Sequence, residues 1–132
     1  MLVDDNPDDN FFHEREILQN NPANIVLTKN SGMMALEYLR LDTGGPHPNL
    51  ILLDINMPGM NGWEFLEEYN LLEKAVRSRA IIVILTTSEN PDDVAKAKGL
   101  TSVSGCISKP LTEGIMKGLI DKHFTRAPTV KP

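Results

Sequence analysis

Short apolar runs alternate with longer amphipathic segments along the whole chain, and this alternation constrains the fold more than any other feature. The apolar runs predict strands over Met1–Val3, Ile25–Thr28, Leu50–Asp54, Ile81–Thr86 and Gly105–Ser108. The segments between them predict helices from Pro7 to about Gln19, from a cap at Ser31 to about Leu41, from Gly62 to about Leu72, from Pro91 to about Gly99, and over Leu111–Phe124. This strict alternation implies an α/β fold: a doubly wound parallel sheet with right-handed crossovers and helices on both faces.

Length and charge narrow the class of protein. A chain of 132 residues fits one domain with one core, without room for a separate effector domain. The formal net charge of −5 disfavours nucleic acid and an anionic membrane surface as partners. The single cysteine, Cys106, excludes an internal disulfide and favours a reducing compartment. No apolar stretch reaches transmembrane length and no signal peptide is evident, so we expect a cytoplasmic protein.

Ionisable and hydroxyl side chains stand where four of the predicted strands end. They are Asp4 and Asp5, Asp54, Thr86, and Lys109. The carboxyl ends of parallel strands are where open α/β folds place their chemistry. Taken singly, each residue also has an ordinary explanation as a loop acid, a strand threonine or a solvated lysine.

Together these residues suit phosphoryl chemistry. Three carboxylates brought close together repel one another and call for a cation, and hard oxygen ligands partly open to water suit Mg²⁺. A lysine is a compact charge for a phosphoryl oxygen, and a hydroxyl can donate to another. Such a set could hold a carboxylate nucleophile, a metal ion and a transferring phosphoryl group.

With these four motifs in this order, the chain resembles a receiver domain of the response regulators of two-component signalling, similar to the single-domain chemotaxis regulators. The resemblance covers residues 1–124 and leaves residues 125–132 as a tail that we expect to be disordered. It implies a flavodoxin-like sheet of five strands in the order 2-1-3-4-5. In that order Asp5 and Asp54 meet at the switch point between the first and third strands.

The resemblance also implies a role for each residue. Asp54 would be the phosphoacceptor. Asp5 would bind Mg²⁺ directly, Asp4 mainly through bound water, and Asn56 through its backbone carbonyl. Lys109 would pair with Asp54 at rest and with the phosphoryl group afterwards.

Two expectations concern the ends of the last two strands. The family's hydroxyl position falls on Thr86 or on the adjacent Thr87, and the register of the strand and of the following helix favours Thr86. The Lys109-Pro110 bond is expected to be cis, as the family's Lys-Pro bond usually is.

The implied function is a phosphorylation-dependent switch. A sensor histidine kinase or a phosphotransfer protein would donate the phosphoryl group, and a downstream protein target would receive the signal. The domain would not be an enzyme beyond catalysing its own phosphotransfer and dephosphorylation. Weak homodimerisation through the last helix and its neighbours stays open.

Two other functions remain in competition. One is a Mg²⁺-dependent phosphohydrolase with an aspartyl-phosphate intermediate, although such enzymes of the haloacid-dehalogenase type have a second acid where this chain has Asn56. The other is a pseudo-receiver, a binding module that is never phosphorylated. Cys106 leaves that alternative open, because many relatives have Tyr or Phe at this position, and the aromatic ring moves when those proteins are activated.

Two further expectations follow from the sequence. Only three residues precede Asp4 where a mean strand has about five or six, so we expect the natural chain to begin before Met1. The three histidines, His13, His47 and His123, show no metal-ligand spacing and are predicted to lie on the surface.

Overall fold

The computed structural model describes residues 1–41, 44–87 and 90–124. Its elements follow the chain as β1 (Leu2–Val3), α1 (Pro7–Asn20), β2 (Thr28–Lys29), α2 (Gly32–Arg40), β3 (Leu50–Leu53), α3 (Gly62–Tyr69), α4 (Lys74–Arg77), β4 (Ile81–Thr86), α5 (Pro91–Lys98), β5 (Val103–Ser108) and α6 (Glu113–His123). The strands form one parallel sheet in the order β2-β1-β3-β4-β5. The predicted fold class and strand order are confirmed.

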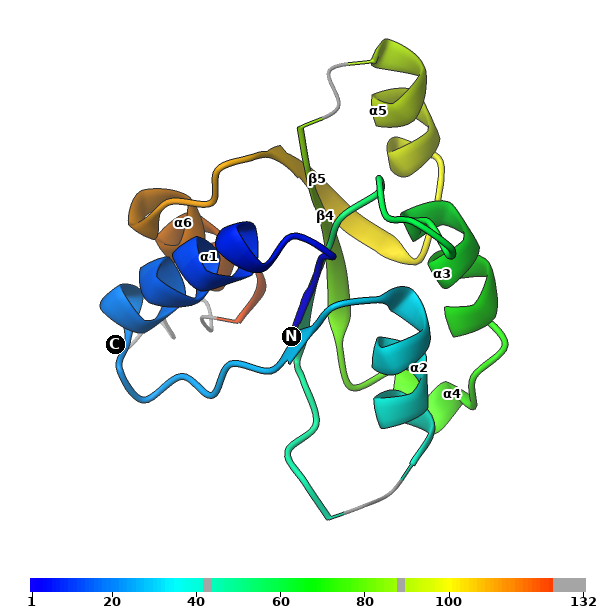
Figure 1. Ribbon diagram of the computed structural model, residues 1–132, viewed down its shortest axis with the longest axis horizontal. Coiled ribbons are helices and arrows are strands. Elements are labelled where there is room, and N and C mark those ends of the chain that lie inside the picture. The colour runs from blue at the N-terminus through cyan, green and yellow to red at the C-terminus, as the bar shows by residue number, and fades with distance from the viewer. Residues whose placement is uncertain (42–43, 88–89, 125–132) are drawn as a thin grey trace, which may run out of the picture.

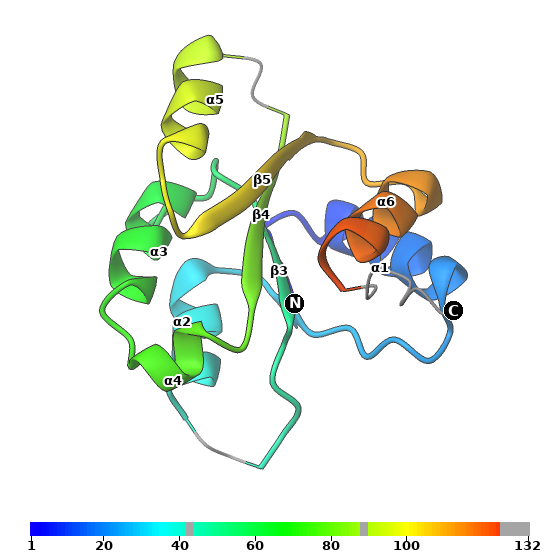
Figure 2. The same cartoon turned by 180° about the vertical axis from the view of Figure 1, so that it is seen from behind.

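The helices cover both faces of the sheet. Helices α1 and α6 lie on one face, and α2, α3 and α5 lie on the other (Figures 1 and 2). Because successive strand residues point to opposite faces, Ile51 and Leu53 of β3 enter the core under α2 and α3, whereas Leu50 and Leu52 enter the core under α1 and α6. Both sides of β3 are therefore buried, as its uninterrupted apolar sequence predicts.

Side-chain caps fix where the helices begin. Asn6 accepts hydrogen bonds from the backbone of Asp8 and Asp9 and so caps α1 directly after the Asp4-Asp5 pair. Ser31 caps α2, as predicted. Caps of this kind are each worth about 1 kcal/mol. The cap at Asn6 makes the chain enter a helix directly beyond the end of the central strand.

Strands β1 and β3 differ from the predictions by one residue, and β2 and β5 differ by more. Strand β2 has two residues rather than four, because it pairs only with β1, whose own two residues lie opposite Thr28 and Lys29. Strand β5 begins at Val103 rather than Gly105, because a register shift between Ile82 and Val83 accommodates an extra residue and lets pairing continue.

The prediction of one helix from Gly62 to about Leu72 is wrong at its end. Helix α3 stops at Tyr69, and the separate short helix α4 follows. The Tyr69 hydroxyl donates to the Arg77 carbonyl oxygen, and the Arg77 Nε donates to the Leu72 carbonyl oxygen. These tertiary bonds fold the chain back, and helical periodicity alone does not reveal them.

Two other expectations concern the end of the chain and membrane-spanning helices. The expected tail, residues 125–132, lies outside the described residues. None of the helices in the described part of the chain is long and apolar enough to cross a membrane.

Candidate functional site

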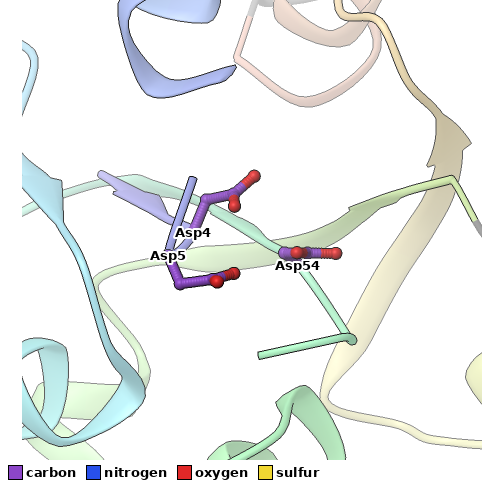
Figure 3. Close-up of side chains that lie close together, drawn as sticks. All are labelled: Asp4, Asp5 and Asp54. Carbon is purple, nitrogen blue, oxygen red and sulfur yellow. The ribbon is translucent and has the colours of Figure 1, made fainter. Parts of the chain in front are cut away.

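Two adjacent central strands deliver three carboxylates to one edge of the sheet. Asp4 and Asp5 follow β1, and Asp54 follows β3 (Figure 3). The ladder continues one residue past each strand, because the Asp54 amide donates to the Val3 carbonyl at 3.0 Å and the Asp4 amide donates to the Lys29 carbonyl at 3.1 Å. These backbone hydrogen bonds position Asp4 and Asp54 at the edge of the sheet independently of their side-chain contacts.

The three acids form a cluster that fits a divalent cation. One oxygen from each of Asp4, Asp5 and Asp54 lies within 4.8 Å of the others. Asp4 and Asp54 are buried, whereas Asp5 is exposed. Burial raises the pKa of Asp54, the Asp4 and Asp5 charges add to that effect, and Lys109 and the Asn56 amide oppose it. Oxygen-only ligands, one of them exposed to solvent, match the preferences of Mg²⁺.

Lys109, the residue directly after β5, contacts the same cluster. Its Nζ lies 2.7 Å from Asp4 Oδ2, 2.8 Å from Asp9 Oδ2 and 3.6 Å from Asp54 Oδ2. Desolvation tends to lower the pKa of Lys109, but the hydrogen bonds to Asp4 and Asp9 and the Asp54 charge raise it above its ordinary value. The bond from Lys109 to Pro110 is cis, as predicted.

The two candidate threonines occupy different environments. Thr86 is the last residue of β4 and is buried, and its carbonyl accepts a hydrogen bond from the Lys109 amide at 2.9 Å. Thr87 is exposed. Asn56 is exposed as well, and its backbone N–H donates a hydrogen bond to Asp54 Oδ1 at 3.4 Å. The residues predicted from four strand ends thus lie at one edge of the sheet.

The loop that follows Asp54 packs tightly against its own beginning. Gly59 adopts a positive φ of 73°, which favours glycine. A Cβ at Gly62 would come within 2.7 Å of the Asp54 carbonyl oxygen and 2.8 Å of the Ile55 Cα. Asn61 and Glu64 form a capping box that starts α3 at that point. The turn residues therefore hold the backbone of Asp54 against the first turn of α3.

Helix α1 contributes three residues that were not predicted from the sequence to lie at the site. Asp9 pairs with Lys109, and the Asn10 Nδ2 donates to the Asp4 carbonyl oxygen at 2.9 Å. His13 is 2% exposed, so the prediction that it lies on the surface is wrong; His47 is exposed and His123 is partly buried. The i, i+4 spacing of Asp9 and His13 was the available signal, because it places both on one side of the helix.

His13 belongs to the electrostatic environment of the lysine. Burial and the Lys109 charge lower the pKa of His13, and the carboxylates of Asp9, Asp4 and Glu16 oppose this. A cavity of about 420 Å³ lies where His13, Asp9 and Lys109 meet Phe12, Thr87 and Pro110. The site is thus open to solvent on the side of α1.

Cys106 lies on β5, three residues before the lysine, and is partly buried. It lines a cavity of about 520 Å³ between α5 and β5, together with Val94 and Ala97. Burial and the Asp93 charge raise the pKa of the thiol, and Lys98 opposes them. A small side chain thus lies beside open space at this position.

Comparison with known proteins gives the same family. The family model of the response regulator receiver domain matches residues 1–121. The probable methanogenesis regulatory protein FilR2 of Methanothrix harundinacea is 36% identical over 69% of this chain, and the response regulator Rcp1 of Synechocystis sp. is 32% identical over 71% of it. The matched regions cover 58% of FilR2 and 65% of Rcp1.

Solved structures share the fold along nearly the whole chain. A response regulator receiver protein from Dyadobacter fermentans superimposes with a TM-score of 0.83 at 30% identity, covering 95% of this chain and 96% of the other. The phosphorylated cyanobacterial phytochrome response regulator RcpA gives 0.76 at 30% identity, covering 97% and 96%. The Mn²⁺-bound form of Rcp1 gives 0.66 at 28% identity, covering 98% and 94%. The sheet order, the acidic cluster and these matches agree: the chain belongs to the family of response regulator receiver domains.

Proposed function

We propose that residues 1–124 act as a phosphorylation-dependent switch in which Asp54 accepts the phosphoryl group. The observation that carries the proposal is the placement of Asp54. Its buried carboxylate shares a cluster with Asp4 and Asp5, and the Lys109 ammonium lies 3.6 Å away. A carboxylate beside both a cation site and a fixed positive charge is suited to attack phosphorus.

Asp5, Asp54 and the Asn56 carbonyl would bind Mg²⁺, and Asp4 would act mainly through a bound water molecule. When bound, the metal ion would neutralise charge on the phosphoryl oxygens. The spacing of the three carboxylates supports this assignment. The Mn²⁺-bound form of Rcp1 supports it from a similar protein.

Side chains of this chain would carry out the transfer and the later hydrolysis. A carboxylate oxygen of Asp54 forms a bond to phosphorus while the bond from phosphorus to the donor breaks. Lys109 donates to one phosphoryl oxygen and the Thr86 hydroxyl to another. Attack of water on phosphorus later releases inorganic phosphate and restores the Asp54 carboxylate. The domain would thus catalyse its own phosphotransfer and dephosphorylation and act on no other substrate.

The donor would be a sensor histidine kinase or a phosphotransfer protein, and the output would be binding to a downstream protein target. RcpA, a similar protein, has been solved in a phosphorylated form, which supports the same chemistry here. Because Cys106 offers no ring to move, we expect the signal to pass through the loop after Thr86 and through α5. Chemical-shift changes between Val94 and Ser104 on addition of beryllofluoride would support this route, and their absence would contradict it.

Intact-protein mass after incubation with Mg²⁺ and acetyl phosphate tests the proposal. The wild-type chain should gain one phosphoryl group in a Mg²⁺-dependent manner, and Asp54→Asn should gain none. A folded wild-type chain without an adduct would support the pseudo-receiver alternative, which the small side chain at Cys106 favours. Steady turnover of a small phosphate ester would instead support a phosphohydrolase.

A further inference from the structure

Lys109 pairs with one carboxylate that does not belong to the acidic cluster. Of its three acidic partners, Asp4 and Asp54 belong to the group of converging carboxylates, but Asp9 does not. Asp9 comes from the first turn of α1, where its amide donates to the capping oxygen of Asn6. The 2.8 Å contact of Asp9 with Lys109 is therefore a separate, charge-assisted hydrogen bond.

Both carboxylate oxygens of Asp4 accept a hydrogen bond in this structure: Oδ1 from the Asn6 backbone amide at 3.0 Å, and Oδ2 from Lys109 at 2.7 Å. A cation bound at the acidic cluster would repel the Lys109 ammonium and compete with it for Oδ2, so its binding would weaken the contact between Lys109 and Asp4. The lysine side chain is only 9% exposed, and a buried ammonium that loses its partner is strongly disfavoured.

Given the proposed function, on which this inference rests, we propose that Asp9 is a positioning residue that keeps Lys109 in place when Asp4 turns to the metal ion. The ammonium has three N–H donors. One stays on Asp9, which leaves the others for Asp54 or for a phosphoryl oxygen. Asp9 thereby lets one lysine serve the resting site and the occupied site without leaving its cavity.

Two effects of Asp9→Asn act in the same direction. Without the second carboxylate, Lys109 remains on Asp4 and competes with the metal ion for its oxygen. The loss of a negative charge near the cluster also weakens the attraction for a cation. Replacing an outer partner of a metal ligand commonly weakens metal binding about 10- to 100-fold, and the 36% exposure of Asp9 places it at the low end.

Calorimetric titration of the full chain with MgCl₂ tests the inference without any phosphoryl donor. Asp9→Asn should weaken Mg²⁺ binding about tenfold. Asp9→Glu, which keeps the charge and an acceptor oxygen, should restore most of the affinity. The matched control is Asp8→Asn, an equal change of charge on an exposed neighbour, which should weaken binding less than about twofold. Equal losses for Asp8→Asn and Asp9→Asn would overturn the inference.

A double-mutant cycle with Lys109→Met separates the contact from the general field. When the lysine is absent, Asp9→Asn should cost no more Mg²⁺ affinity than Asp8→Asn does. An undiminished loss in that background would show that Asp9 does not act through Lys109 and would overturn the inference. Circular dichroism and thermal unfolding without Mg²⁺ confirm that each variant is folded.

The outcomes for Asp9 and for the proposed function are distinguishable. If the wild-type chain takes up a phosphoryl group but Asp9→Asn binds Mg²⁺ normally, only the inference about Asp9 fails. If the wild-type chain binds Mg²⁺ and the Asp9 variants behave as expected, but no adduct forms at Asp54, only the phosphoacceptor role fails. A wild-type chain that binds no Mg²⁺ would overturn both.

Discussion

Two buried basic side chains, Lys109 and His13, line the same cavity, and they differ in their partners. Lys109, at the carboxyl edge of the sheet, donates to the carboxylates of Asp4 and Asp9. His13, on α1, is 2% exposed. Although burial opposes the charge of both, the acidic partners raise the pKa of Lys109, whereas burial and the Lys109 charge lower the pKa of His13.

The difference shows what burial does to charge in this fold. Desolvation by itself removes the proton, and only opposite charges at hydrogen-bond distance retain it. At the carboxyl edge, the hydrogen bonds to Asp4 and Asp9 outweigh the burial of Lys109 and raise its pKa. Buried and paired charges of this kind are typical of functional sites, here one that could bind a phosphoryl group and a cation.

The largest expected effect concerns Lys109. Lys109→Met leaves Asp4 and Asp54 buried without their cation, which should lower the free energy of unfolding by about 3 kcal/mol in the absence of metal. Added Mg²⁺ should restore part of this loss, because it supplies the missing positive charge. Lys117→Met, on the exposed side of α6, is the control and should change stability little. A loss that Mg²⁺ does not reduce would argue against a cation site.

The tight backbone at the carboxyl edge gives a second test. Gly62→Ala should destabilise the fold by about 2 kcal/mol, because the new Cβ would meet the Asp54 and Ile55 backbone, which cannot move aside easily. Gly114→Ala in α6 meets no atom within 4 Å and should stabilise the helix slightly. Thermal unfolding of both variants measures the difference. Equal behaviour of the two would mean that the loop after Asp54 is not constrained as described.

The smallest expected effect concerns His13. Burial and the Lys109 charge lower its pKa, so Lys109→Met should move the pKa of His13 upward, toward its ordinary value. Titration followed by NMR of the ring protons measures this shift directly. His123, at the far end of α6, is the internal reference. A His13 pKa that does not respond to Lys109→Met would show that the two groups are not electrostatically coupled.

Local sequence predicted much of this molecule, for physical reasons. Leu50–Leu53 and Ile81–Thr86 are apolar on both faces, so their burial between two helical layers could be inferred from the sequence. Ser31 is a good helix cap, and α2 begins directly after it. The cluster of Asp4, Asp5 and Asp54 followed from the rule that parallel strands end at one edge.

What the sequence did not reveal depends on contacts between distant segments. Asp9 was not predicted to belong to the site, and its bond to Lys109 arises because the first turn of α1 lies beside the residue that follows β5. The burial of His13 has the same origin. The end of α3 and the separate helix α4 depend on the bonds from Tyr69 to Arg77 and from Arg77 to Leu72, which helical periodicity does not encode.

The most direct test of the central claim is to locate the phosphoryl group along the chain. Borohydride reduces an aspartyl phosphate to homoserine, so treatment of the protein after incubation with Mg²⁺ and acetyl phosphate should convert residue 54, as peptide mass spectrometry would show. Omitting Mg²⁺ should abolish the conversion, and Lys109→Met should diminish it. Homoserine at position 4 or 5, or none at any position in the folded wild-type chain, would contradict the assignment of Asp54 as the phosphoacceptor.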